Sequence, residues 1–202
     1  MIELLRGLTS KGYGLHLFQP EWFEPDNDAK PFKSPTVVPT PNKDDMIHGL
    51  ADACSDDALW LVSSIVEYVK ETGEFDFIDQ VITYADKGEG TVYEHMTRIL
   101  DFSTEQVGAT GVCKGLRADW NDCLKLGYHG QSLFVGFQLR LGLTTYADIA
   151  TRLGKKEEAE DRIENLKEFI SNSDINISYK YHMGTHMPVP PLQMLLDNLL
   201  HS

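Results

Sequence analysis

The segment from Ser132 to Leu153 is the feature that most constrains how this chain can fold. Its spacing predicts one long helix, and apolar side chains fall on most sides of that helix. A helix of this kind is stable only when neighbouring elements cover it, so we expect it to lie deeply buried. The rest of the chain must therefore supply elements whose apolar faces turn toward it.

Residues 56–72 are predicted to form one such neighbouring helix. Ser55 is expected to cap its first turn, where the charges of Asp56 and Asp57 are favourable, and Gly73 is expected to end it. The predicted buried stripe of this helix consists of Leu59, Val62, Val66 and Val69.

Several further helices are predicted, with few strand signals between them. Residues 1–11 resemble the end of a helix that stops near Gly12, and a shorter helix is expected over 75–81. Thr91 is a candidate cap for a third long helix. The inward side chains of this third helix are predicted to be Val92, Met96, Ile99 and Leu100. Those of the last long helix are predicted to be Ala159, Ile163, Leu166 and Ile170. The predicted fold class is all-α, either a bundle or a helical toroid.

Two segments depart from this helical pattern. Residues 19–49 form a long loop rich in proline, which is either functional or a plain surface connection. In the tail, Ile177, Tyr179, Tyr181 and Met183 alternate with polar residues as in a strand. We therefore divide the chain into a helical catalytic part, 1–170, and an atypical C-terminal tail, 171–202.

Composition excludes several classes of partner. The formal net charge of −13 excludes a basic nucleic-acid-binding surface and disfavours anionic membranes. No apolar run reaches the ~18 residues of a membrane-spanning helix, and the N-terminus lacks the order of a signal peptide. Three cysteines without a paired motif predict free thiols and a cytoplasmic location. His182 and His186 lack a third ligand, so no metal or cofactor is predicted.

The run 117–123, with the sequence RADWNDC, carries the chemistry most suited to a site. Trp120 offers a flat face to a pyranose ring, and Asn121 can both donate to and accept from hydroxyl groups. A carboxylic acid, Asp119 or Asp122, can protonate a glycosidic oxygen. The alternative interpretation is an acidic turn with a buried tryptophan, since short motifs alone are weak indicators.

This run lies within residues 113–127, CKGLRADWNDCLKLG, which resemble the catalytic segment of glycoside hydrolase family 94, the inverting disaccharide phosphorylases. Five other stretches agree in order and spacing over roughly residues 1–170: GLHLF at 14–18, KSPTVVPTP at 33–41, CSDDALWL at 54–61, YVKETG at 68–73, and residues 84–95. Within the family, the SPTVVPTP loop and the KGLRA lead-in most resemble enzymes that act on N,N'-diacetylchitobiose, followed by those that act on cellobiose.

The resemblance implies part of an (α/α)6 barrel that phosphorolyses a β-linked disaccharide to a sugar 1-phosphate and a free sugar. It assigns the general acid to Asp122 and sugar contacts to Trp120 and Asn121. Asp119 is placed with these substrate-binding residues, as the side chain that orients the loop. Inorganic phosphate is the expected co-substrate, and a homodimer is expected for the full-length family protein.

Family members are several times longer than this chain, so we expect an internal fragment that contains the general acid but not the phosphate site. The isolated chain is accordingly expected to have little activity. Two alternatives from other classes stay open. One is a noncatalytic helical carbohydrate-binding or interaction module, and the other is an all-α glycosidase with Asp119 or Glu94 as its second carboxylate. Asp56 and Asp57 are better explained as a helix N-terminus than as a catalytic pair.

Overall fold

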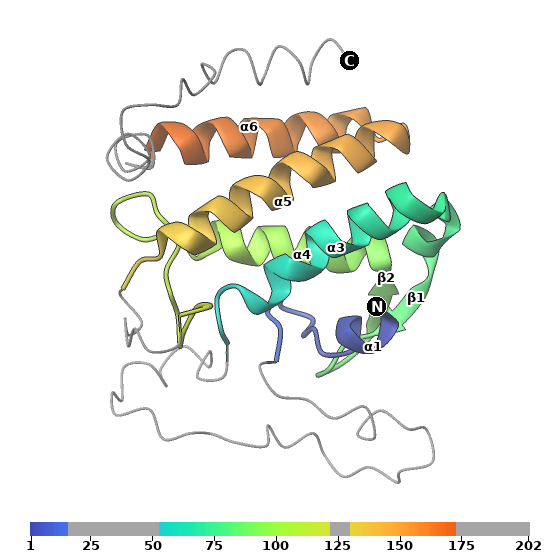
Figure 1. Cartoon of the computed structure of the whole chain (residues 1–202), viewed down its shortest axis with the longest axis horizontal. Helices are drawn as coiled ribbons and strands as arrows, with labels where there is room; N and C mark the ends of the chain where they lie inside the picture. The colour runs from blue at the N-terminus through green and yellow to red at the C-terminus, as the bar shows by residue number, and fades with distance from the viewer. Residues whose placement is uncertain (16–52, 122–129, 173–202) are drawn as a thin grey trace, which may run out of the picture.

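The computed structural model describes residues 1–15, 53–121 and 130–172, and all structural statements below refer to these residues. The four long helices account for most of the described part (Figure 1). In chain order the elements are α1 (Ile2–Leu5), α3 (Asp57–Thr72), the 3-10 helix η2 (Phe75–Asp79), β1 (Val81–Thr83), β2 (Glu89–Thr91), α4 (Val92–Glu105), α5 (Leu133–Arg152) and α6 (Lys156–Asn172).

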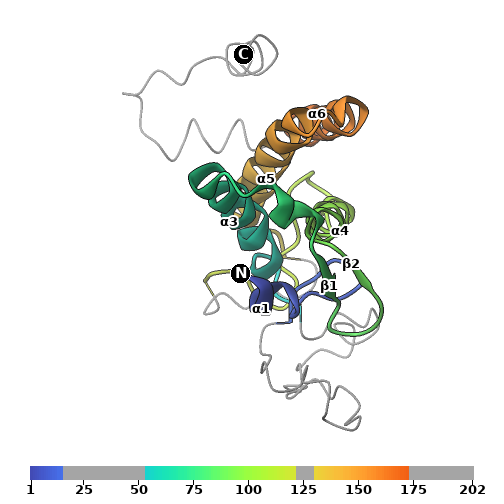
Figure 2. The same ribbon diagram turned by 90° about the vertical axis from the view of Figure 1, so that its right-hand side faces the viewer.

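Helix α5 is the centre of the arrangement, because it packs against α3, α4 and α6. Figure 2 shows α3 and α4 on either side of α5, with α6 beyond it. Helices α3 and α5 start at the same end of the molecule, whereas α4 and α6 run the opposite way (Figure 1). The predominance of helix that the sequence predicts is thus confirmed for the described residues.

The expectation that α5 is deeply buried holds for one face and is wrong for another. Leu139, Leu143 and Tyr146 are fully buried, and Gly142 allows Leu100 of α4 to approach closely. A second stripe of the same helix is exposed, consisting of Phe134, Phe137 and Leu141. The described helices cover only part of the circumference of α5, so a helix that is apolar on most sides leaves one apolar face bare.

Helix α3 follows the predicted stripe but not the predicted cap. Leu59, Val62, Val66 and Val69 are all buried, and Gly73 ends the helix in the left-handed conformation with φ 73°. The N-cap residue is Asp56, whose side chain makes no capping bond. Ser55, the predicted cap, instead donates its hydroxyl to the Ala118 carbonyl at 3.2 Å. The Ser55 hydroxyl therefore bonds to a residue distant in the chain instead of capping α3.

Helix α4 confirms the predicted cap at Thr91. The Thr91 hydroxyl accepts from the Glu94 amide at 3.1 Å, and the Glu94 carboxylate accepts from the Thr91 amide at 2.7 Å, which together make a capping box. The predicted inward residues of α4 are fully buried, and those of α6 are buried or partly buried: Val92, Met96, Ile99 and Leu100, and Ala159, Ile163, Leu166 and Ile170.

A short hairpin replaces part of the helix expected over 75–81. Residues Phe75–Asp79 form η2, but Val81 begins β1, which pairs antiparallel with β2 in the register Val81↔Thr91. The expected N-terminal helix is also shorter, because α1 ends at Leu5. The loop predicted at 19–49 and the tail from 173 onward lie outside the described residues. None of the helices in the described part is long and apolar enough to cross a membrane.

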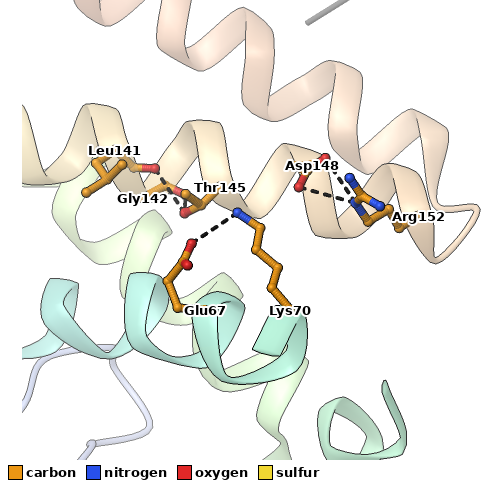
Figure 3. A network of polar contacts seen from close by, with 7 residues as sticks. All are labelled: Glu67, Lys70, Leu141, Gly142, Thr145, Asp148 and Arg152. Carbon is orange, nitrogen blue, oxygen red and sulfur yellow. Dashed lines mark hydrogen bonds and ion pairs between the residues drawn. The ribbon is translucent and has the colours of Figure 1, made fainter. Parts of the chain in front are cut away.

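Figure 3 shows a group of polar contacts on the C-terminal halves of α3 and α5. Lys70 of α3 forms an ion pair with Glu67 at 3.0 Å, and Arg152 of α5 forms one with Asp148 at 3.2 Å. Between them, the Thr145 hydroxyl donates to backbone carbonyls of its own helix. All of these interactions lie within a single helix and near solvent, so each contributes little to the free energy of unfolding.

Candidate functional site

The stretch 113–118, which leads into the RADWND run, lies between the segments that begin α3 and α5. On the α3 side, Cys54 and Leu116 form an antiparallel bridge. The Arg117 amide donates to the Ala53 carbonyl at 3.1 Å, and the Ser55 amide donates to the Ala118 carbonyl at 2.9 Å. These backbone bonds fix the stretch directly against the entry to α3.

The opposite edge of the same stretch pairs with the entry to α5. Lys114 and Gln131 form a second antiparallel bridge. The Gly115 amide donates to the Gly130 carbonyl at 2.8 Å, and the Ser132 amide donates to the Cys113 carbonyl at 2.8 Å. Two helix N-termini, with the partial positive charge that such ends carry, therefore flank the run.

Leu116 carries conformational strain at the centre of this arrangement. Its φ of 51° lies in the left-handed region, and it is the one non-glycine residue there in the described part of the chain. Its side chain is nonetheless buried, in a small cluster with Ala53, Phe102 and Tyr13. Strain of this kind persists only where the surroundings enforce it, and it gathers at functional sites.

Asp119 is turned inward and joins the run to the start of α5. One carboxylate oxygen accepts from the Asn121 amide at 2.9 Å, and the other accepts from the Ser132 hydroxyl. The Ser132 hydroxyl in turn accepts from the Val135 amide at 3.3 Å, so it is also the N-cap of α5. Both oxygens of Asp119 thus bond to backbone or side-chain groups of the loop and of the start of α5.

The next two residues of the run point outward. Trp120 is 75% exposed, and Asn121 is exposed as well. This exposure contradicts the alternative interpretation, in which the run is an acidic turn around a buried tryptophan. Asp122, the acid that the resemblance assigns, lies outside the described residues, as do Cys123, His182 and His186.

Asp56, which the sequence pattern explains only as a charge at a helix N-terminus, also belongs to this region. It is 4% exposed, and its carboxylate accepts from the Trp60 indole Nε1–H at 3.2 Å. Burial raises the pKa of the Asp56 carboxyl; the Trp60 bond lowers it, and the charges of Asp57 and Asp119 raise it further. Its four-residue separation from Trp60, one helical turn, is a signal that could have revealed the pair.

The remaining candidate groups in the described residues have structural roles. Glu94 is held in its capping box, so it is not free to serve as a second catalytic carboxylate. Cys54 and Cys113 are buried and neither is in a disulfide, and burial raises the pKa of Cys113 to about 12, so its thiol is unreactive. In the described part of the chain no three His, Cys, Asp or Glu side chains gather as a metal site would require.

Comparison with known proteins gives a consistent picture. The model of the glycosyl hydrolase 94 superfamily catalytic domain matches residues 1–180. The chain is 58% identical over 159 residues to the N,N'-diacetylchitobiose phosphorylase of Vibrio proteolyticus, and 58% identical over 151 residues to that of Vibrio furnissii. These alignments cover 78% and 74% of this chain but 20% and 19% of the relatives.

A more distant similarity points the same way. The solabiose phosphorylase of Paenibacillus borealis is 31% identical over 106 residues, which is 51% of this chain and 14% of that protein. The chain therefore spans about a fifth or less of the length of the curated relatives that it matches. Each of the three relatives carries the name of a disaccharide phosphorylase, an enzyme that cleaves a disaccharide with phosphate.

Proposed function

Because the chain belongs to the glycosyl hydrolase 94 superfamily, we propose that it forms the general-acid segment of an inverting disaccharide phosphorylase, with Asp122 as the acid. One observation carries this proposal. The stretch that leads into RADWND is hydrogen-bonded between two helix N-termini, Asp119 is turned inward, and Trp120 is turned out toward solvent. That arrangement presents the ring of Trp120 and the side chain of Asn121 at an edge fixed by backbone hydrogen bonds.

Inverting phosphorolysis requires one carboxylic acid as general acid, and it does not require a second catalytic carboxylate. In an inverting phosphorolysis, a phosphate oxygen forms a bond to the anomeric carbon from the face opposite the glycosidic bond. The C–O bond to the leaving sugar breaks as Asp122 transfers its proton to that oxygen. The products are a sugar 1-phosphate and a free sugar. Within the run, Trp120 contacts a sugar ring, Asn121 binds its hydroxyls, and Asp119 keeps the loop in place.

The substrate that the comparisons favour is N,N'-diacetylchitobiose. Two relatives with 58% identity are named for it, whereas the relative named for solabiose is 31% identical. Cellobiose is the second choice, on the resemblance alone. We also propose that α3 and α5, which share a direction, are inner helices of an (α/α)6 barrel, with α4 and α6 as returning outer helices.

Neither Cys54 nor Cys113 is in a disulfide, which supports a reducing compartment such as the cytoplasm, and the resemblance supports a homodimer. A glycosidase is less well supported, because such an enzyme usually needs a second carboxylate. The two candidates for that role, Asp119 and Glu94, both hold backbone amides.

The test uses both the chain itself and a chimera. In the chimera, the 159 aligned residues of this chain replace those of the Vibrio proteolyticus enzyme. We expect the chimera to convert N,N'-diacetylchitobiose and phosphate to N-acetylglucosamine 1-phosphate. Asp122→Asn in the chimera should lower kcat by roughly 10²-fold or more, as loss of a general acid does.

Three outcomes would contradict the proposal. Full activity of the Asp122→Asn chimera would show that Asp122 is not the general acid. Release of free sugar without sugar 1-phosphate would indicate a glycosidase. A chimera that folds, binds the disaccharide and turns nothing over would indicate a noncatalytic binding module. The isolated chain, assayed in parallel, is expected to give little sugar 1-phosphate.

A further inference from the structure

Two exposed aromatic rings lie together at the end of the α3–α5 pair that adjoins the RADWND run. Trp60 is in the first turn of α3 and Phe134 is in the first turn of α5. Their ring centroids are 6.1 Å apart, at an interplanar angle of 51°. Trp60 is 49% exposed and Phe134 is 38% exposed. Large apolar side chains usually lie inside, so an exposed aromatic pair beside a candidate site is informative.

The Trp60 ring is held at its polar edge by a hydrogen bond. The indole N–H donates to the Asp56 carboxylate, which is buried at the start of the same helix. This bond satisfies the single donor of the indole and restricts rotation of the ring. The apolar surface of the indole that remains exposed is therefore presented in one orientation.

Both rings are also close in the chain to groups that hold the run. Ser55 bonds to Ala118 just before α3, and Ser132 bonds to Asp119 just before α5. Trp60 and Phe134 follow these two contacts by five and two residues. Trp60 and Phe134 are therefore anchored by the same helix starts that bond to Ala118 and Asp119.

We propose that Trp60 and Phe134 form an aromatic platform that binds a pyranose ring of the saccharide, in addition to Trp120. The proposal rests on the proposed function, because it names a second saccharide-binding surface of that same site. A pyranose ring has an apolar face of C–H groups, and tryptophan and phenylalanine offer large rigid apolar surfaces at small entropic cost. Toward the far end of the same helix pair, Glu67 and Lys70 form an ion pair instead of an aromatic pair.

The first measurement is binding of N,N'-diacetylchitobiose to the full chain without phosphate. The indole N–H signals of Trp22, Trp60 and Trp120 are followed by NMR, each assigned through a Trp→Phe variant. We expect the Trp60 and Trp120 signals to shift together during the titration. Trp60→Ala should weaken the affinity about tenfold and Phe134→Ala about fivefold, as expected for central aromatic contacts.

Two variants serve as controls. Trp60→Phe keeps an aromatic face but loses the bond to Asp56, so it should weaken binding less than Trp60→Ala does. Phe75→Ala removes an aromatic ring of similar exposure, 41%, next to the far end of α3, and it should leave the affinity unchanged. Circular dichroism of each variant shows that its helix content is retained.

The second measurement separates this inference from the proposed function. In the active chimera, Trp60→Ala should raise KM about tenfold with kcat nearly unchanged, as loss of uniform binding does. A chimera that is active while Trp60→Ala leaves KM and the affinity unchanged overturns the platform alone. A wild-type chain that binds no disaccharide, or one in which only the Trp120 signal shifts, also overturns it. If the chimera binds the disaccharide at Trp60 but forms no sugar 1-phosphate, the proposed function is wrong and the aromatic platform is still supported.

Discussion

The two ends of the α3–α5 helix pair differ in how their side chains are held. At the end next to the RADWND run, Asp119 is nearly buried and accepts a hydrogen bond from Ser132, 13 residues away, and Asp56 is buried and accepts one from Trp60 of its own helix. At the far end, Asp148 pairs with Arg152 within one helix and near solvent. Aspartate side chains are thus buried at the first end, where Asp119 also joins separate segments, and lie near solvent at the far end. Polar side chains tie the fold together only where they link separate segments.

The sharpest test of this difference is to remove an aspartate from each end. Asp119→Ala deletes the acceptor for the Asn121 amide and the Ser132 hydroxyl, so the free energy of unfolding should fall by about 3 kcal/mol. Asp148→Ala loses an exposed i,i+4 ion pair and should cost about 0.5 kcal/mol. Urea denaturation followed by circular dichroism measures both. Equal losses would show that the two ends do not differ.

Hydroxyl groups on α5 offer a second pair of variants. Ser132→Ala removes the N-cap of α5 and the donor to Asp119, which should cost about 1.5 kcal/mol. Thr145→Ala removes a hydroxyl that bonds only within its own helix, and alanine favours helix, so stability should change little. The same denaturation experiment applies. A larger loss for the Thr145 variant would reverse the interpretation.

The raised pKa of Asp56 predicts that the free energy of unfolding depends on pH. Burial raises its folded pKa above the unfolded value, so its contribution to stability is full below pH 3.8 and is lost as pH rises through the folded pKa. Asp56→Asn keeps a neutral acceptor for Trp60 and should therefore be more stable than wild type at pH 7. That advantage should shrink as the pH falls toward 4.

The matched variant for this measurement is Asp148→Asn, which weakens an exposed ion pair instead of relieving a buried charge. It should give no gain in stability at pH 7. Unfolding midpoints at several pH values between 4 and 7 report the effect for both variants. A constant difference between Asp56→Asn and wild type across that range would count against a raised pKa in the folded protein.

The smallest expected effect lies at the far end itself. Lys70→Ala removes the i,i+3 ion pair with Glu67, and the loss should be about 0.3 kcal/mol at low salt. In 1 M NaCl, where the pair is screened, the difference from wild type should vanish. Loss of more than 1 kcal/mol would mean that this end carries more of the stability than its geometry indicates.

Local signals were sufficient for much of the fold. The cap at Thr91 and the start of α5 at Ser132 depend on residues within three or four positions, so the sequence alone predicts them. The hydroxyl of Ser55 was misassigned because its partner, Ala118, is 63 residues away. The β1–β2 hairpin was likewise missed, since its short strands carry almost no periodicity.

The candidate site shows the same division. The chemistry of Trp120 and Asn121 can be read from their side chains, and the resemblance supplies an orienting role for Asp119. The bond from Ser132 to Asp119 and the contact between Trp60 and Phe134 join residues 13 and 74 positions apart. Only packing brings such pairs together, so no local pattern could have revealed them.

The bridged stretch 113–118 has a further consequence for motion. The stretch is neither helix nor strand, yet its backbone forms hydrogen bonds with residues 53–55, just before α3, and with residues 130–132, just before α5. Amide protons of Ser55, Gly115, Arg117 and Ser132 should therefore exchange with solvent at similar, slow rates, as one cooperative opening unit. Loop residues of this kind would open together with the helix ends rather than independently. Asp119, which bonds to Ser132 at the start of α5, should then open on the same timescale as the two helix ends.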